Sequence, residues 1–247
     1  MPTNEGMNVS DAIDPESTLG DLVTAIPALA APLDRLGLDY CCGGGRSLAG
    51  AVRAADGDLD DVLAILSDAA EDSAGQDREE WATLGPTDLV DHLEVTPHAY
   101  LRDSLPRLEA LAAKVSSVHG DRHPELIDVH RVVVEIRSDL EPHLLKEERV
   151  LFPMIRELAS ATDAPEFHCG TIANPIRMMG IEHDRAGELL AQLREVTRGY
   201  AVPADGCASY DALFRELAAF EADTHLHVHK ENNVLFPAVL ALETQHS

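Results

Sequence analysis

Apolar residues recur every three or four positions through most of the chain, the spacing of a helix that packs one face against a core. In the longer, C-terminal part this pattern predicts four long helices, over residues 87–117, 124–160, 174–198 and 208–243. The stretches between them contain Gly and Pro, which are typical of loops. Because short loops join antiparallel helices, the pattern predicts an all-α fold built on an antiparallel four-helix bundle.

The N-terminal part shows the same spacing in shorter runs. Helical patterns cover residues 18–38 and 58–69 and are separated by the Gly-rich turn CCGGGRS. We expect three short helices there, in a small helical domain over residues 18–68. The polar, charged residues 69–86 include Gly and Pro and predict a linker. The bundle then occupies residues 87–247.

An internal repeat joins the second and fourth predicted helices. The segments His143-LLK-Glu147 and His227-VHK-Glu231 have the same spacing, and both continue to Val-Leu-Phe-Pro. One further histidine lies upstream of each segment at nearly the same distance. These two are His98 and His183. The repeat therefore predicts a helical hairpin that is used twice.

All six repeated polar residues fall on the apolar stripes of their helices, so their side chains are expected to point into the core. An imidazole or a carboxylate buried without a partner costs several kcal/mol, and a pair of metal ions would compensate for six of them. A Glu from each of two helices can bridge two ions that histidines cap. Imidazole and carboxylate without thiolate favour iron or manganese over structural zinc. The predicted metal ligands are His98, His143, Glu147, His183, His227 and Glu231.

Two histidines and two prolines flank these positions. His225 and His229 each lie two residues from His227, which turns them off the core face, and we interpret them as exposed or as supporting the ligands from outside. Pro97 and Pro142 each directly precede a predicted ligand, where a proline removes a backbone hydrogen bond. We expect helix kinks at the site.

The four cysteines do not form a disulfide framework, because Cys41 and Cys42 are adjacent while Cys169 and Cys207 lie far away in loop-like sequence. In the CCGGG turn, Cys41 and Cys42 are expected to be accessible, with backbone amides and a following helix start that favour thiolate. They are candidate cofactor-binding residues with a redox, iron-handling or docking role. The alternative is a structural turn in which they pack as small apolar residues.

The charge of the chain excludes several partners. There are 44 acidic and 19 basic residues, a formal net charge of −25, which repels phosphate backbones and anionic lipid headgroups. Nucleic acid and membranes are therefore poor candidates. The N-terminus has no signal-peptide pattern and no stretch is long and apolar enough to span a bilayer, so a cytoplasmic protein is expected.

Taken together, the motifs resemble those of the RIC (repair of iron centres) or ScdA family. The resemblance is carried by KEE..LFP, KENNVLFP, EHDRAGELL and LDYCCGGGRSL, and it covers nearly the whole chain after about residue 17. It implies a hemerythrin-like bundle with two non-haem iron ions that are bridged by an oxygen and by Glu147 and Glu231. The four histidines would complete the ligand set.

The resemblance also implies a function: the repair of iron-sulfur clusters damaged by nitrosative or oxidative stress, with damaged iron-sulfur proteins as partners and iron donation as one route. A second interpretation is a protein that binds or senses oxygen or nitric oxide and signals through the small domain, or that reduces nitric oxide. Whether the protein is an enzyme is left open by both. A bundle whose polar core pairs without metal is disfavoured, because four histidines cannot neutralise two glutamates so simply. A homodimer formed through the small domain is a further expectation.

Overall fold

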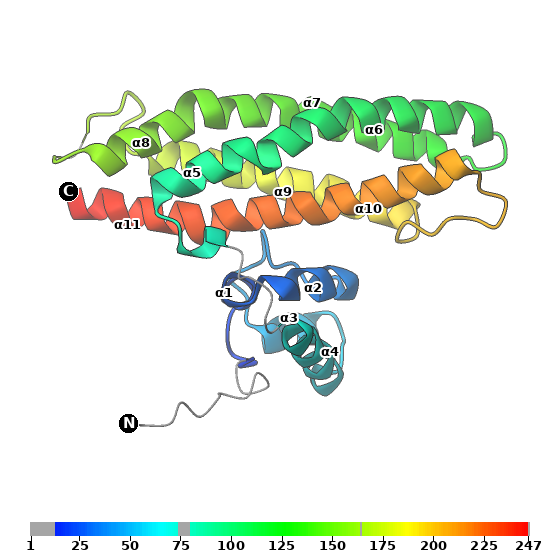
Figure 1. Ribbon diagram of the computed structural model, residues 1–247, viewed down its shortest axis with the longest axis horizontal. Coiled ribbons are helices and arrows are strands. Elements are labelled where there is room, and N and C mark those ends of the chain that lie inside the picture. Colours follow the sequence, from blue (N-terminus) through cyan, green and yellow to red (C-terminus); the bar gives the residue numbers. More distant parts are fainter. Residues whose placement is uncertain (1–12, 74–79, 164, 247) are drawn as a thin grey trace. The chain divides into compact units, whose positions relative to one another are not determined.

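The computed structural model describes residues 13–73, 80–163 and 165–246, and over these ranges it contains helices and no β-strand. The all-α prediction is confirmed. The chain divides into two compact units (Figure 1). The N-terminal unit comprises the described residues up to Thr83 together with Val228–Val234, and the bundle unit comprises Leu84–His227 and the residues from Leu235 onward.

The N-terminal unit is built from short helices. Over residues 13–73 it has four α-helices instead of the expected three: the first helical pattern is divided at Pro27, and a further helix lies between the two patterns. Ile26, which precedes this proline, has φ −136° and ψ 84°, outside the helical region as a residue before proline favours. The helices are α1 (Leu19–Ala25), α2 (Ala30–Leu36), α3 (Leu48–Ala54) and α4 (Leu59–Asp72), with a 3₁₀ turn at Pro27–Leu29.

The bundle unit has its helices where the periodicity predicts them, but three of the four are divided. The first is broken at Thr96, which has φ −111° and ψ −84° directly before Pro97, so the predicted kink is present there. Pro142, by contrast, lies inside a continuous helix. The helices are α5 (Pro86–Val95), α6 (Pro97–His119), α7 (Glu125–Lys146), α8 (Phe152–Ser160), α9 (Ala173–Val196), α10 (Ala208–His229) and α11 (Phe236–His246).

Two π-helical turns interrupt the second and fourth helices, at Glu147–Leu151 and Lys230–Leu235. In the first, the N–H of Phe152 donates to the carbonyl of Glu147, five residues earlier. Each turn is followed by the proline of the Leu-Phe-Pro sequence, and a proline ring clashes with the carbonyl four residues before it. We attribute the wider turn to relief of that clash, and π-helical turns are frequent at functional sites.

The apolar core lies between the four long helices α6, α7, α9 and α10, which run along one another in Figure 1. Leu105, Val133, Leu190 and Leu217, one from each helix, are each 2% exposed or less. Burial of such a side chain contributes about 1.5–3 kcal/mol, so this core fixes the helices on which the predicted ligands sit. None of the described helices combines the length and the apolar content that crossing a lipid bilayer requires.

Candidate metal centre

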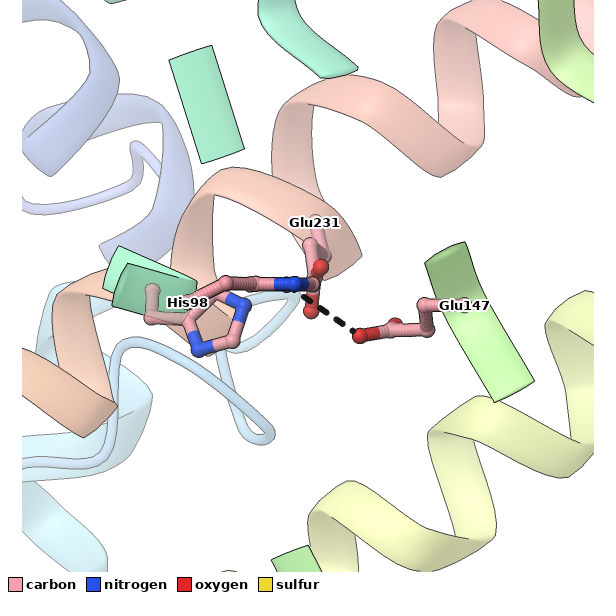
Figure 2. Close-up of side chains that lie close together, drawn as sticks. His98, Glu147 and Glu231 are labelled. Carbon is pink, nitrogen blue, oxygen red and sulfur yellow. Dashed lines mark ion pairs between the residues drawn. The ribbon is translucent and has the colours of Figure 1, made fainter. Parts of the chain in front are cut away.

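The six predicted ligands come together as two overlapping groups of buried side chains. Within each group, one ligand atom from every residue lies within 4.8 Å of the others. Figure 2 shows His98, Glu147 and Glu231 with their polar ends turned toward one another. The first group is His98, Glu147, His227 and Glu231, and the second is His143, Glu147, His183 and Glu231. All six side chains are 2% exposed or less.

Glu147 and Glu231 belong to both groups, whereas each histidine belongs to one. The glutamates come from the two copies of the repeat and stand in the two π-helical turns. Two carboxylates shared by two clusters, each with its own pair of imidazoles, form the arrangement in which carboxylates bridge two ions. The geometry therefore fits a two-ion centre better than a single ion.

The surroundings of Glu147 give the strongest support for a bound cation. Its Oε2 lies 3.5 Å from Nε2 of His98 and 3.4 Å from Nε2 of His143, and neither of its oxygens accepts a hydrogen bond from the described residues. The side chain is 0% exposed. A buried carboxylate without hydrogen bonds is costly unless a positive charge compensates for it, and a bound cation would provide that charge.

The histidine rings are held with Nε2 toward the site. His98 donates from Nδ1 to Glu148 over 2.7 Å, and His143 donates from Nδ1 to Glu182 over 3.0 Å. Because a carboxylate only accepts, Nδ1 carries the proton, and Nε2 of the neutral ring keeps its lone pair for a metal. The Nε2 atoms of His143 and His183 lie 3.2 Å apart, as two ligands of one ion would.

The two supporting glutamates were missed by sequence reasoning, although each is the immediate neighbour of a predicted ligand. Glu148 also pairs with Arg102, and Glu182 with Lys146. Burial raises the pKa of Glu182, but the hydrogen bonds from Lys146 and His143 outweigh it and hold the pKa below its usual value. Glu182 therefore stays ionised and keeps accepting from His143.

The phenylalanines of the repeat pack against the two upstream histidines. The ring of Phe152 stacks on His98 with centroids 5.3 Å apart, and the ring of Phe236 stacks on His183 with centroids 6.0 Å apart. The Leu-Phe-Pro sequence thus has a role at the centre: its proline is accompanied by the wide turn, and its phenylalanine fixes an imidazole plane and excludes water beside it.

His229 is not exposed, so that part of the expectation was wrong. It is 0% exposed and belongs to the N-terminal unit, where its Nε2 lies 3.2 Å from Oγ1 of Thr24 and its ring packs against Trp81. Burial lowers the pKa of His229 to about 4, although its hydrogen bond to the carbonyl of Tyr40 acts in the opposite direction. The ring is therefore neutral near pH 7. His225 is half-buried.

The turn that carries the two adjacent cysteines also corrects an expectation. Cys41 is only 6% exposed, and the backbone amides of Cys41, Cys42 and Gly43 donate to the carboxylate of Asp39 rather than to a thiol. The hydrogen bond with Cys42, followed by burial, raises the pKa of Cys41 well above its usual value, so the thiol is favoured there. Cys42 is half-buried. Asp39, Cys41 and Cys42 form a third group able to hold a metal ion.

Cys207 has the properties that were expected of the paired cysteines. It is exposed, directly precedes α10, and its Sγ lies 3.1 Å from Nε2 of His119. The backbone N–H of Tyr210, in the first turn of α10, is the largest cause that lowers the pKa of Cys207. The loop before a long helix is the signal from which this could have been predicted.

Comparisons with known proteins match both parts of the chain. A family model described as the hemerythrin HHE cation binding domain matches residues 89–239, and the ScdA_N model, described as a domain of unknown function, matches residues 15–70. The iron-sulfur cluster repair protein YtfE of Salmonella schwarzengrund is 34% identical over 228 residues, which cover 92% of this chain and 98% of that protein. A probable iron-sulfur cluster repair protein of Haemophilus influenzae is 34% identical over 225 residues, which cover 91% and 97%.

Proposed function

The chain belongs to the RIC family of iron-sulfur cluster repair proteins, and we propose on this basis that it is a di-iron protein that restores damaged iron-sulfur clusters. The observation that carries the proposal is the pair of carboxylates, Glu147 and Glu231, common to the two groups of ligands. One ion would be held by His98 and His227 and the other by His143 and His183, with both glutamates shared.

Iron is the metal that the donor set and the family match together support best. The six side chains offer imidazole nitrogen and carboxylate oxygen without thiolate, which suits iron or manganese, and the matching family model is that of a cation binding domain of the hemerythrin type. When bound, an iron pair would supply one-electron redox chemistry. Glu148 and Glu182 keep the lone pairs of His98 and His143 available for it.

Iron donation is the route of repair that we propose. The ligands are all harder than thiolate, so ferrous iron is expected to be held less firmly than ferric iron. Reduction would therefore favour release to an acceptor that offers sulfur ligands. Iron that stays fully bound after reduction, with a ferrous chelator present, would contradict this route.

We include Cys41 and Cys42 in the proposal as a second iron-handling site, together with Asp39. A Cys41→Ser, Cys42→Ser double variant should repair clusters more slowly while the histidine and glutamate centre keeps its iron. Equal repair by this variant and the wild type would remove the cysteines from the function.

A reconstituted repair assay tests the function as a whole. Iron-loaded protein is mixed anaerobically with an iron-sulfur protein whose cluster has been damaged by nitric oxide, and recovery of the cluster is followed by absorbance. The Glu147→Ala, Glu231→Ala double variant should lose recovery, while Glu141→Ala, which changes a glutamate on the surface of α7, should retain it. A helical and folded double variant that repairs as well as the wild type would refute the proposal.

A further inference from the structure

Most of the second π-helical turn belongs to the N-terminal unit, which includes Val228–Val234. The amide nitrogen of Asn233 lies 3.2 Å from the carbonyl oxygen of Tyr40 and 3.0 Å from that of Cys41. Because carbonyls only accept, the amide of Asn233 is the donor to both oxygens. The amide nitrogen of Asn232 lies 3.4 Å from the same Cys41 oxygen. Two successive residues after Glu231 are thus tied to the backbone at Cys41.

Asn233 lies so close to the backbone of Gly20 and Gly44 that neither residue could carry a side chain. A Cβ atom added at Gly44 would lie 2.5 Å from Oδ1 of Asn233, and one added at Gly20 would lie 2.8 Å from it. The N–H of Gly20 also donates to the carbonyl of Gly44 over 2.9 Å, which holds the two glycines together. Gly20, Tyr40, Cys41 and Gly44 form what we call the Asn233 seat.

The seat is built into the same loop as the thiols. Asp39 accepts hydrogen bonds from three successive amides of this loop, and Sγ of Cys41 lies 3.2 Å from Oδ1 of Asp39 and 3.9 Å from Sγ of Cys42. A group added to the sulfur of Cys41 must displace part of this loop, because that atom is buried and lies against both Asp39 and the sulfur of Cys42. The carbonyl of Cys41, which Asn233 holds, would move with it.

The first copy of the repeat lacks this connection. Arg149 stands where the second copy has Asn233, and it is exposed. Glu148 stands where the second copy has Asn232, and it accepts from His98 instead. The hydrogen bonds to the cysteine loop therefore come from two residues, Asn232 and Asn233, that the first copy does not have.

We propose that Asn233 is a positioning residue that ties the turn carrying Glu231 to the Cys41–Cys42 loop, so that a chemical change at either thiol is transmitted to Glu231. The proposal rests on the proposed function in one respect, the role of Glu231 as a metal ligand. The link itself is a property of the polypeptide, and it is tested with and without metal.

The first test measures amide hydrogen exchange on metal-free protein in a Cys169→Ser, Cys207→Ser background. Iodoacetamide is the probe: a cysteine sulfur forms a C–S bond, iodide leaves and the thiol proton passes to buffer. Alkylation should speed exchange in residues 228–235 by about tenfold, the effect of losing one hydrogen bond, and leave residues 147–151 unchanged. Asn233→Ala should show the faster exchange without alkylation, and alkylation should add nothing to it.

The matched control is Arg149→Ala, the same truncation at the equivalent position of the first copy, which should respond to alkylation as the wild type does. Asn233→Asp is a second variant of nearly the same size that removes both N–H donors, and it should behave as Asn233→Ala does. Exchange in residues 228–235 that is insensitive to alkylation in the wild type, or equally sensitive in both Asn233 variants, would overturn the proposal.

The second test follows the loss of iron to a ferrous chelator from iron-loaded protein. The rate of iron loss from alkylated wild type and from unmodified Asn233→Ala should differ by about tenfold from that of the untreated wild type. This is the size of effect that substitutions beside metal ligands have. Unchanged rates in both would overturn transmission to the centre. Protein that binds no iron at the six residues would instead refute the proposed function, and the exchange experiment would still decide the role of Asn233.

Discussion

The two copies of the repeat, His143–Pro153 and His227–Pro237, share the residues at the candidate centre and differ at several positions that face away from it. Both have a histidine, a glutamate in a π-helical turn and a phenylalanine stacked on another histidine. At the outward positions Leu145 is 43% exposed, whereas its counterpart His229 is fully buried among residues of the N-terminal unit. Metal-binding positions have stayed alike, while outward positions have taken different partners.

The largest expected effect tests whether the two glutamates are equivalent. Because each carboxylate belongs to both groups of ligands, Glu147→Ala and Glu231→Ala should each lose most of the bound iron, not half of it. Iron content per chain, measured after anaerobic purification, checks this. Loss of one ion in one variant and of none in the other would mean that the glutamates are not shared.

The next effect concerns the pH dependence of stability that His229 causes and its counterpart Leu145 cannot. The pKa of His229 is lowered from 6.5 to about 4 in the folded protein. Between these pH values the unfolded chain is protonated at His229 and the folded chain is not. The free energy of unfolding is therefore unaffected by this histidine above pH 6.5 and decreases as the pH falls toward 4, by about 3 kcal/mol in total. His229→Leu, which copies the residue of the first repeat, should reduce this decline in chemical denaturation of metal-free protein. Identical pH profiles would show that the burial of His229 has no such cost.

The third effect concerns Glu148 and Glu182, the two glutamates that orient the ligand histidines. Glu148→Ala and Glu182→Ala should each weaken iron binding by about 10–100-fold, because each leaves an imidazole without its Nδ1 partner. Competition with a chelator measures the affinity. Glu188→Ala, which removes an exposed carboxylate from α9, serves as the control and should leave the affinity unchanged.

The smallest effect concerns the seat of the second copy. Gly44→Ala places a Cβ 2.5 Å from both Oδ1 of Asn233 and the carbonyl of Tyr40, and should destabilise the protein by about 1–3 kcal/mol. Gly45→Ala is the matched control, because nothing lies within 4 Å of the added atom. Thermal denaturation should therefore separate two neighbouring substitutions of identical chemistry, and equal melting temperatures would argue against a tight seat.

The sequence predicts the helices and the six candidate ligands because both depend on local periodicity and on a repeat. Periodicity does not reveal the π-helical turns, since the stripe His143, Glu147, Leu151 and Met154 keeps a spacing of three or four residues through the first of them. Glu148 and Glu182 look like ordinary solvated charges until the histidines are placed in space. The burial of Cys41 and His229 arises from contacts such as that between Tyr40 and Asn233, which are separated by 193 residues and follow no pattern in either segment.

The presence of a two-iron centre is tested by the metal content and Mössbauer spectrum of protein purified anaerobically and then oxidised. We expect two irons per chain that behave as a magnetically coupled pair, because two ions that share Glu147 and Glu231 must lie close together. Zinc alone, no metal, or a single uncoupled iron would contradict it, and would leave the six buried side chains without the charge that explains their burial.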